Sequence, residues 1–236
     1  MEKILRKGSV IFCELVTVGT CVWLIANGIL DNRLLLAVVT IPLTLAPGLV
    51  ERFFKCRFWT PLYLLCVLYS IGPMLGHTLN FYSLIPHWDK LLHITGGVVF
   101  AIVGYFLFQM MVGRDTKKTT AAAVFALCFS MALSMAWEFY EFGSDTLLGT
   151  DTQADTMVTS ITSHYFSDVM GEVGTIDPIE SVTINGQAMD WDGYLDLGLH
   201  DTMMDMLLET LGAVVIAVFF LVDRGRHPLA RFREEA

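Results

Sequence analysis

The chain has 236 residues, of which 54% are hydrophobic, and a formal net charge of −9 at neutral pH. Soluble domains are typically about 45–50% apolar, and the mean hydropathy here is +0.57. The acidic balance argues against nucleic acid as a partner, because binding a phosphate backbone requires basic surface. The composition therefore indicates a protein whose partner is the lipid bilayer.

Six apolar blocks approach the roughly 20 residues that a membrane-spanning helix requires. The first follows Lys3, Arg6 and Lys7, but it is longer than a signal-peptide core and lacks a small-residue cleavage site, so we expect a retained helix. The second contains Pro42 and Pro47, which membrane helices tolerate when neighbours satisfy the freed carbonyls. The blocks predict an all-α integral membrane protein with six transmembrane helices, at residues 9–29, 34–50, 60–80, 91–112, 119–142 and 202–222.

The basic residues fall almost entirely on one side of these spans. Thirteen of the fifteen Lys and Arg lie before the first span, in the 51–58 and 113–118 loops, or after the last span. The opposite side has only Arg33 and Lys90. By the positive-inside rule the basic side is cytoplasmic. We therefore expect a multi-pass protein of the bacterial cytoplasmic (inner) membrane with both termini in the cytoplasm.

The sequence divides into three parts: transmembrane helices one to five at 1–142, an acidic extracytoplasmic loop at 143–200, and helix six with a basic cytoplasmic tail at 201–236. The loop has ten Asp and Glu and no Lys or Arg, so it attracts cations. Residues 143–152 are turn-like, and apolar spacing predicts a short amphipathic helix over 153–166. Asn185-Gly186 between alternating residues predicts a hairpin. The loop is expected to form a small mixed cap.

Ionisable residues recur at the outer ends of spans four, five and six. Helical spacing places Asp89 and His93 on one face, Glu138 and Glu141 on another, with Asp145 continuing that face, and Asp201, Asp205 and Glu209 on a third. With a rise of about 1.5 Å per residue, His93, Glu138 and Asp205 lie at one depth, roughly 6 Å inside the outer boundary. Gly96-Gly97 and Gly212 share these faces and would let the helices approach closely.

These residues predict a metal site. Charges inside a membrane are costly, and this part of the chain lacks Arg, so a cation or shared protons must offset the carboxylates. We expect the ligands of a divalent metal ion to be His93, Glu138, Glu141, Asp201 and Asp205, with Asp89, Asp145 and Glu209 as secondary candidates. A competing interpretation makes Glu141, Asp145 and Asp201 solvated helix ends and Asp89 a helix N-cap.

Four segments resemble the YjdF-like family of uncharacterised bacterial inner-membrane proteins: DKLLHITGG (89–97), WEFYE (137–141), GTDTQADT (149–156) and DTMMDMLLETLGA (201–213). Span four onward is more distantly similar to VanZ-like membrane proteins, although Glu209 stands near a position where those often have Asn. The resemblance implies one group made of Asp89, His93, Glu138, Glu141, Asp201 and Asp205. It implies no established reaction.

Three functions remain open from the sequence. The first is a polytopic membrane protein of unassigned activity with an outward-facing acidic and His site that binds a divalent cation. The second is a membrane-embedded, metal-dependent hydrolase or transferase acting on a lipid-linked or cell-envelope substrate, with Glu138 or Glu141 as general base. The third is a cation or proton transporter that uses Asp201, Asp205 and Glu209 as a ladder. Neither the metal's identity nor the oligomeric state follows from the sequence.

Overall fold

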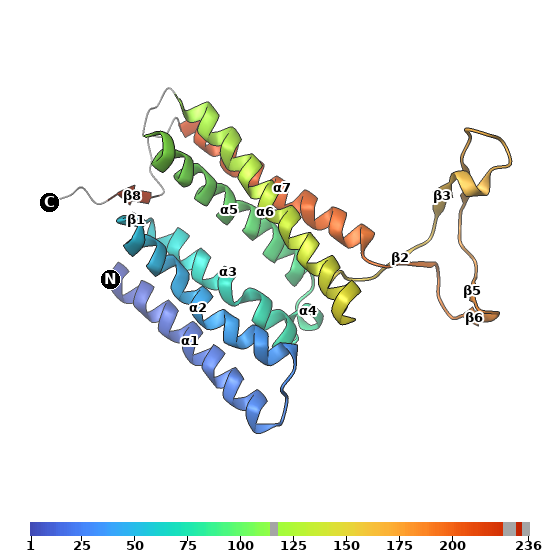
Figure 1. Cartoon of the computed structure of the whole chain (residues 1–236), viewed down its shortest axis with the longest axis horizontal. Coiled ribbons are helices and arrows are strands. Elements are labelled where there is room, and N and C mark those ends of the chain that lie inside the picture. The colour runs from blue at the N-terminus through green and yellow to red at the C-terminus, as the bar shows by residue number, and fades with distance from the viewer. Residues whose placement is uncertain (114–117, 224–229, 233–236) are drawn as a thin grey trace. The chain divides into compact units, whose positions relative to one another are not determined.

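The structure, a computed structural model, describes residues 1–113 and 118–223 and the backbone of residues 230–232 (Figure 1). The expected basic loop at 113–118 and the basic tail lie largely outside these residues. The described chain forms two compact units. The first unit is Met1–Ser134 with Leu207–Ala236, and the second unit is Met135–Met206.

The chain is mainly helical, and all six predicted spans are helices. The long ones are α1 (Glu2–Ala26), α2 (Asn32–Phe53), α3 (Thr60–Thr78), α5 (Trp88–Val112), α6 (Thr119–Leu148) and α7 (Leu199–Asp223), and the short α4 covers Phe81–Leu84. Among the described residues, five helices are long and apolar enough to cross a membrane: α1, α2, α5, α6 and α7. The remaining predicted span is α3, whose 19 residues include Tyr63, Tyr69 and Pro73.

The starts and ends of these helices follow from local chemistry. The Asp31 side chain caps α2 by accepting a hydrogen bond from the Arg33 amide at 3.0 Å. Pro42 and Pro47 lie inside α2, and the helix continues through both, as predicted. Gly113, with φ 85°, ends α5 in a conformation that side chains disfavour.

In the first unit, α1, α2 and α3 lie side by side (Figure 1), and their buried residues form one apolar core with part of α5. Leu24, Val67 and Met74 are fully buried in it. Strand β1 (Cys56–Phe58), which follows α2, pairs antiparallel with β8 (Ala230–Phe232). The helices and this short ladder hold the first unit together without a disulfide among the described cysteines.

Helices α5 and α7 approach each other closely within the first unit. A Cβ atom on Gly97 would lie 2.0 Å from the carbonyl oxygen of Glu209, and one on Gly212 would lie 2.3 Å from the carbonyl oxygen of Ile94. Two backbones can come this near only where the side chain is a hydrogen atom. The close approach predicted from these glycines is therefore confirmed.

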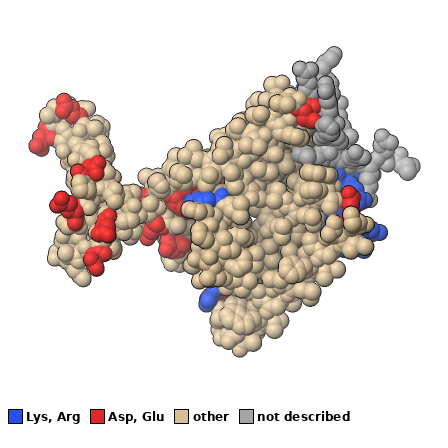
Figure 2. Space-filling view, turned by 180° about the vertical axis from the view of Figure 1, so that it is seen from behind, with Lys and Arg blue, Asp and Glu red and all other residues tan. Residues whose placement is uncertain are grey.

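The second unit contains the end of α6, the start of α7 and the acidic segment between them. That segment has no cap helix; it forms short strands β2 (Thr156–Val158), β3 (Ile161–Ser163), β4 (Gly174–Ile176), β5 (Val182–Ile184), β6 (Gln187–Met189) and β7 (Tyr194–Asp196), with a 3₁₀ turn, η2, at His164–Phe166. Three antiparallel ladders result: β2 with β7, β3 with β4, and β5 with β6. Figure 2 shows Asp and Glu spread over this segment without Lys or Arg among them.

Two predictions for this segment were wrong and one is confirmed. The amphipathic helix at 153–166 is absent, because β-branched Thr156, Val158 and Ile161 enter ladders instead. Helix α6 runs on to Leu148, six residues beyond the predicted end at 142, so residues 143–148 of the stretch expected to be turn-like (143–152) are helical. The hairpin is confirmed: β5 and β6 join through Asn185 at φ 52° and Gly186 at φ 82°, the favoured two-residue turn.

Candidate functional site

Most of the ionisable residues predicted for the site are buried. Asp205 is 1% exposed and Glu209 2% exposed, and four others are also more than nine-tenths buried: His93, Glu138, Glu141 and Asp201. Asp89 and Asp145 are half-buried. Glu141 and Asp201 are therefore not solvated helix ends, which removes the competing interpretation for these two residues.

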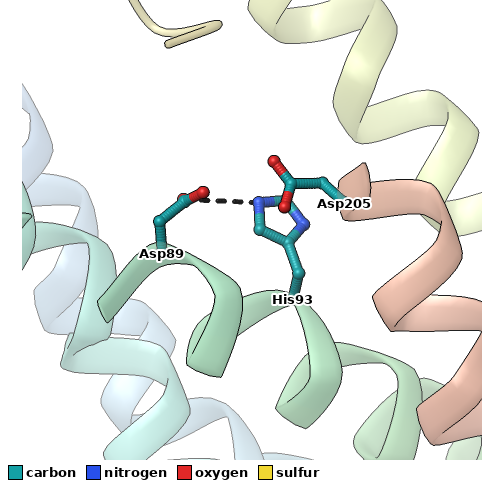
Figure 3. A group of neighbouring side chains, drawn as sticks. All are labelled: Asp89, His93 and Asp205. Carbon is teal, nitrogen blue, oxygen red and sulfur yellow. Dashed lines mark ion pairs between the residues drawn. The ribbon is translucent and has the colours of Figure 1, made fainter. Parts of the chain in front are cut away.

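In the first unit, His93 lies between two carboxylates. Its Nε2 atom is 3.4 Å from Asp89 Oδ1, one helical turn earlier on α5, and Figure 3 shows this pair. Its Nδ1 atom is 4.0 Å from Glu209 Oε1 on α7. Lys90 contacts the other Asp89 oxygen at 3.1 Å. The imidazole is thus held in an acidic environment with one basic residue beside it.

Asp89 does not cap its helix. The N-cap of α5 is His87, in a left-handed conformation at φ 61°, and Asp89 lies in the first turn. A carboxylate there still interacts favourably with the helix dipole. The N-cap interpretation of Asp89 is wrong, and its carboxylate faces His93 and Lys90 instead.

In the second unit, Asp145 organises the loop that follows α6. Its Oδ1 accepts hydrogen bonds from the Thr150 hydroxyl at 2.7 Å and from the Thr152 amide and hydroxyl at 2.7 and 2.8 Å. Its Oδ2 accepts from the Gln153 amide at 2.8 Å. With four such contacts, Asp145 acts as an anchor for residues 150–153. These contacts give Asp145 a structural role, whereas the sequence analysis made it a secondary candidate for a metal ligand.

The same loop also contacts the ends of both long helices within the second unit. The Thr152 hydroxyl donates to the Glu141 carbonyl oxygen at 3.1 Å, and the Ala154 amide donates to Asp201 Oδ2 at 2.8 Å. The Gln153 side chain bonds to the Thr202 hydroxyl. The sequence analysis did not predict that this loop connects α6 to α7. The run of hydroxyl and amide side chains in GTDTQADT was the signal that could have indicated it. The loop fixes the start of α7 relative to the end of α6.

Two more carboxylates, Glu141 and Asp151, differ in their local surroundings. Trp137 Nε1 donates to Glu141 Oε1 at 2.9 Å, one helical turn away on α6. Outside the helices, loss of hydration and then repulsion from Asp155, Asp145 and Asp201 raise the pKa of Asp151 above its ordinary value. Negative charge is therefore concentrated around the GTDTQADT loop, and a nearby cation would relieve it.

Replacing Asp145 with alanine is expected to release this loop. Each buried polar group left without its hydrogen bond costs about 1–3 kcal/mol, so the amides of Thr152 and Gln153 should exchange at least about tenfold faster, since 1.4 kcal/mol corresponds to a factor of ten. Hydrogen exchange read by mass spectrometry checks this, with exposed Asp155→Ala as the control. Equal protection in the two variants would show that Asp145 does not anchor the loop.

Comparison with known proteins identifies the family. The family model described as predicted membrane protein (DUF2238) matches residues 10–226. An uncharacterised protein from Thermotoga maritima is 32% identical over 77 residues, which is 32% of this chain and 38% of that protein. No solved structure matches. Because the family model covers nearly the whole chain, this protein belongs to the DUF2238 family of predicted membrane proteins.

Proposed function

We propose that this protein crosses the bacterial cytoplasmic membrane six times, with both termini inside, and binds a divalent cation at an outward-facing site formed by His93, Glu138, Glu141, Asp201 and Asp205. Helix α3 is the sixth span in this proposal. The observation that carries it is the burial of four carboxylates in the second unit, which contains no Lys or Arg. The YjdF-like motifs contain all five of these residues with their spacing.

The charge balance supports a cation. Between Arg57 and Arg224 the chain has basic residues only at Lys90 and in the expected cytoplasmic loop at 114–118. Lys90 is engaged with Asp89. A buried carboxylate is costly unless an opposite charge or a metal is near. In the proposed topology, Lys90 is the one Lys or Arg beside the buried carboxylates in the outer half of the membrane. A divalent ion would offset two of their negative charges at once.

The helical register supports a single site. In the first unit, Glu209 lies beside His93 and Ser134, which brings α5, α6 and α7 to one level. Helix α6 continues without interruption from Ser134 to Glu138, and α7 continues from Asp205 to Glu209, each step being one turn of about 6 Å. We therefore infer that Glu138 lies one turn beyond that level along α6, and Asp205 one turn beyond it along α7.

The donor types limit the choice of metal. Carboxylate oxygens favour Mg²⁺, Ca²⁺ or Mn²⁺, and an imidazole admits Zn²⁺ or Fe²⁺. A set of one imidazole and several carboxylates suits Mn²⁺ or Zn²⁺ best. Glu138 lies one helical turn after Ser134 on α6. We expect it to contact the ion most directly. The secondary candidate Asp89 would then receive the imidazole N–H and orient the ring.

A melting series in lipid nanodiscs tests the proposal. A ligand that binds only the folded state adds RT ln(1 + [L]/Kd), about 2.7 kcal/mol at one hundred times Kd, so Tm should rise with Mn²⁺ or Zn²⁺ after treatment with a chelator. Glu138→Gln and Asp205→Asn should blunt the rise. The matched control Asp168→Asn changes an exposed carboxylate of the acidic segment and should not. Equal responses in all three variants would mean diffuse screening and no site.

A further inference from the structure

A buried acidic position that the proposed divalent site does not use lies within the first unit, at Glu209. Glu209 is 2% exposed, and its Oε2 atom has no hydrogen-bond partner among the residues that the structure describes. The Ser134 hydroxyl lies beside the carboxylate, and its oxygen is also buried without a hydrogen-bond partner among the described residues. A carboxylate oxygen in this situation is costly to bury, so it points to a ligand.

Gly96 makes room for this position. A Cβ atom on Gly96 would lie 2.7 Å from Glu209 Oε1 and 2.9 Å from the Tyr69 hydroxyl. Both oxygens therefore reach the same small space from different helices, α7 and α3, over the bare backbone of α5. The Tyr69 ring is held by an edge contact with Phe100, with ring centroids 5.8 Å apart. The side chains are thus positioned by packing, and any larger residue at 96 would displace them.

We propose that Glu209, Tyr69 and Ser134 form an inner site for a small monovalent cation of the size of sodium. Three oxygens, one of them charged, come from three helices, and hard oxygen donors are the ligands that such ions prefer. The site has one carboxylate, and the nearby His93 adds no negative charge. A divalent ion would leave a buried positive charge uncompensated, whereas a monovalent ion balances Glu209.

A cation between Glu209 and Ser134 gives both oxygens a partner at once. The inference rests on the first unit alone and does not require the divalent site.

The test is a sodium titration of purified protein in nanodiscs, with a chelator present and choline chloride keeping the ionic strength constant. Tm should rise with NaCl and less with KCl. Tyr69→Phe removes one oxygen and keeps the ring, and it should weaken the apparent sodium affinity at least about tenfold, while Glu209→Gln should abolish the response. Tyr105→Phe changes a buried tyrosine of this unit outside the proposed site and should leave the response unchanged.

The outcomes separate this site from the divalent one. Asp205→Asn should have a blunted divalent response and keep the sodium response. If the Tm of the wild-type protein rises equally with choline chloride and with sodium chloride, the proposal of the inner site is wrong, even if the divalent response is intact. If Glu209→Gln does not fold, Tyr69→Phe still decides, because a sodium response equal to that of Tyr105→Phe would contradict the assigned ligands.

Discussion

Replacing Gly97 with alanine is expected to destabilise the folded protein by about 3 kcal/mol or more, at the upper end of overpacking effects. The added methyl group would lie 2.0 Å from the Glu209 carbonyl oxygen, and the contact is with backbone, so a side-chain rotation cannot relieve it. Helices α5 and α7 would have to separate. Unfolding in detergent, followed by circular dichroism, measures the loss.

Gly19→Ala provides the matched control for this prediction. Gly19 lies in α1, and a Cβ atom added there would meet nothing within 4 Å, so its replacement should gain about 0.5–1 kcal/mol from helix propensity. Gly212→Ala meets the Ile94 carbonyl at 2.3 Å and should behave like Gly97→Ala. Because both glycines serve one helix crossing, the double variant should lose less than the sum of the two single losses. Full additivity would argue against a shared crossing.

The apolar blocks predicted the helices well, because a run of about 20 apolar residues has few stable alternatives in a bilayer. The blocks at 9–29 and 91–112 correspond to α1 and α5 within a few residues, except that α1 begins at Glu2. Helix ends were predicted less well. Gly143 did not stop α6, because a single glycine lowers helix stability by only about 1 kcal/mol and the flanking residues favour the helix.

The acidic segment was predicted correctly only where local chemistry decides the structure. Asn185-Gly186 specifies its turn through backbone conformation, and the hairpin followed. Residues 153–166 depend on partners far along the chain, since β2 pairs with β7 and β3 with β4. Apolar residues at helical spacing cannot reveal a strand partner about forty residues away, as for Thr156 and Asp196.

For the candidate site, the sequence predicted burial better than it predicted roles. Glu138, Asp205 and Glu209 are all buried, as their depth along the helices required. Asp145 was grouped with them because it continues the same helix face, but its carboxylate is used by the amides and hydroxyls of residues 150–153. The path of the loop decides which carboxylate accepts hydrogen bonds from the loop's amides. Helical periodicity carries no information about that path.

A second large effect is expected at the Arg6 position, where a buried ion pair joins α1 to α2. Arg6 was predicted as one of the cytoplasmic basic residues, yet it is 7% exposed and bonds to Glu51. Glu51 Oε1 also accepts from the Phe58 amide at 2.6 Å, and the guanidinium carbon lies 3.9 Å from the centre of the Tyr63 ring. The pair therefore connects α1, α2, β1 and α3.

Replacing Glu51 with alanine should cost about 3–5 kcal/mol of unfolding free energy, because it leaves the Arg6 charge buried without its partner. The Arg57–Glu2 pair provides the control: its atoms are 3.9 Å apart, and both side chains are more than half exposed. An exposed pair contributes about 0–1 kcal/mol, so Arg57→Ala should change stability little. Unfolding in detergent, with the same probe for each variant, supplies the comparison.

A double-mutant cycle separates the pair from the rest of its surroundings. Exchanging a buried pair for apolar residues of similar volume is often close to neutral, so Arg6→Met with Glu51→Leu should be more stable than either single variant. The coupling should exceed about 1 kcal/mol, within the range for residues in direct contact. If the double variant instead loses the sum of both single effects, Arg6 and Glu51 act independently, and packing of Arg6 against Tyr63 accounts for the stability of this end of the first unit.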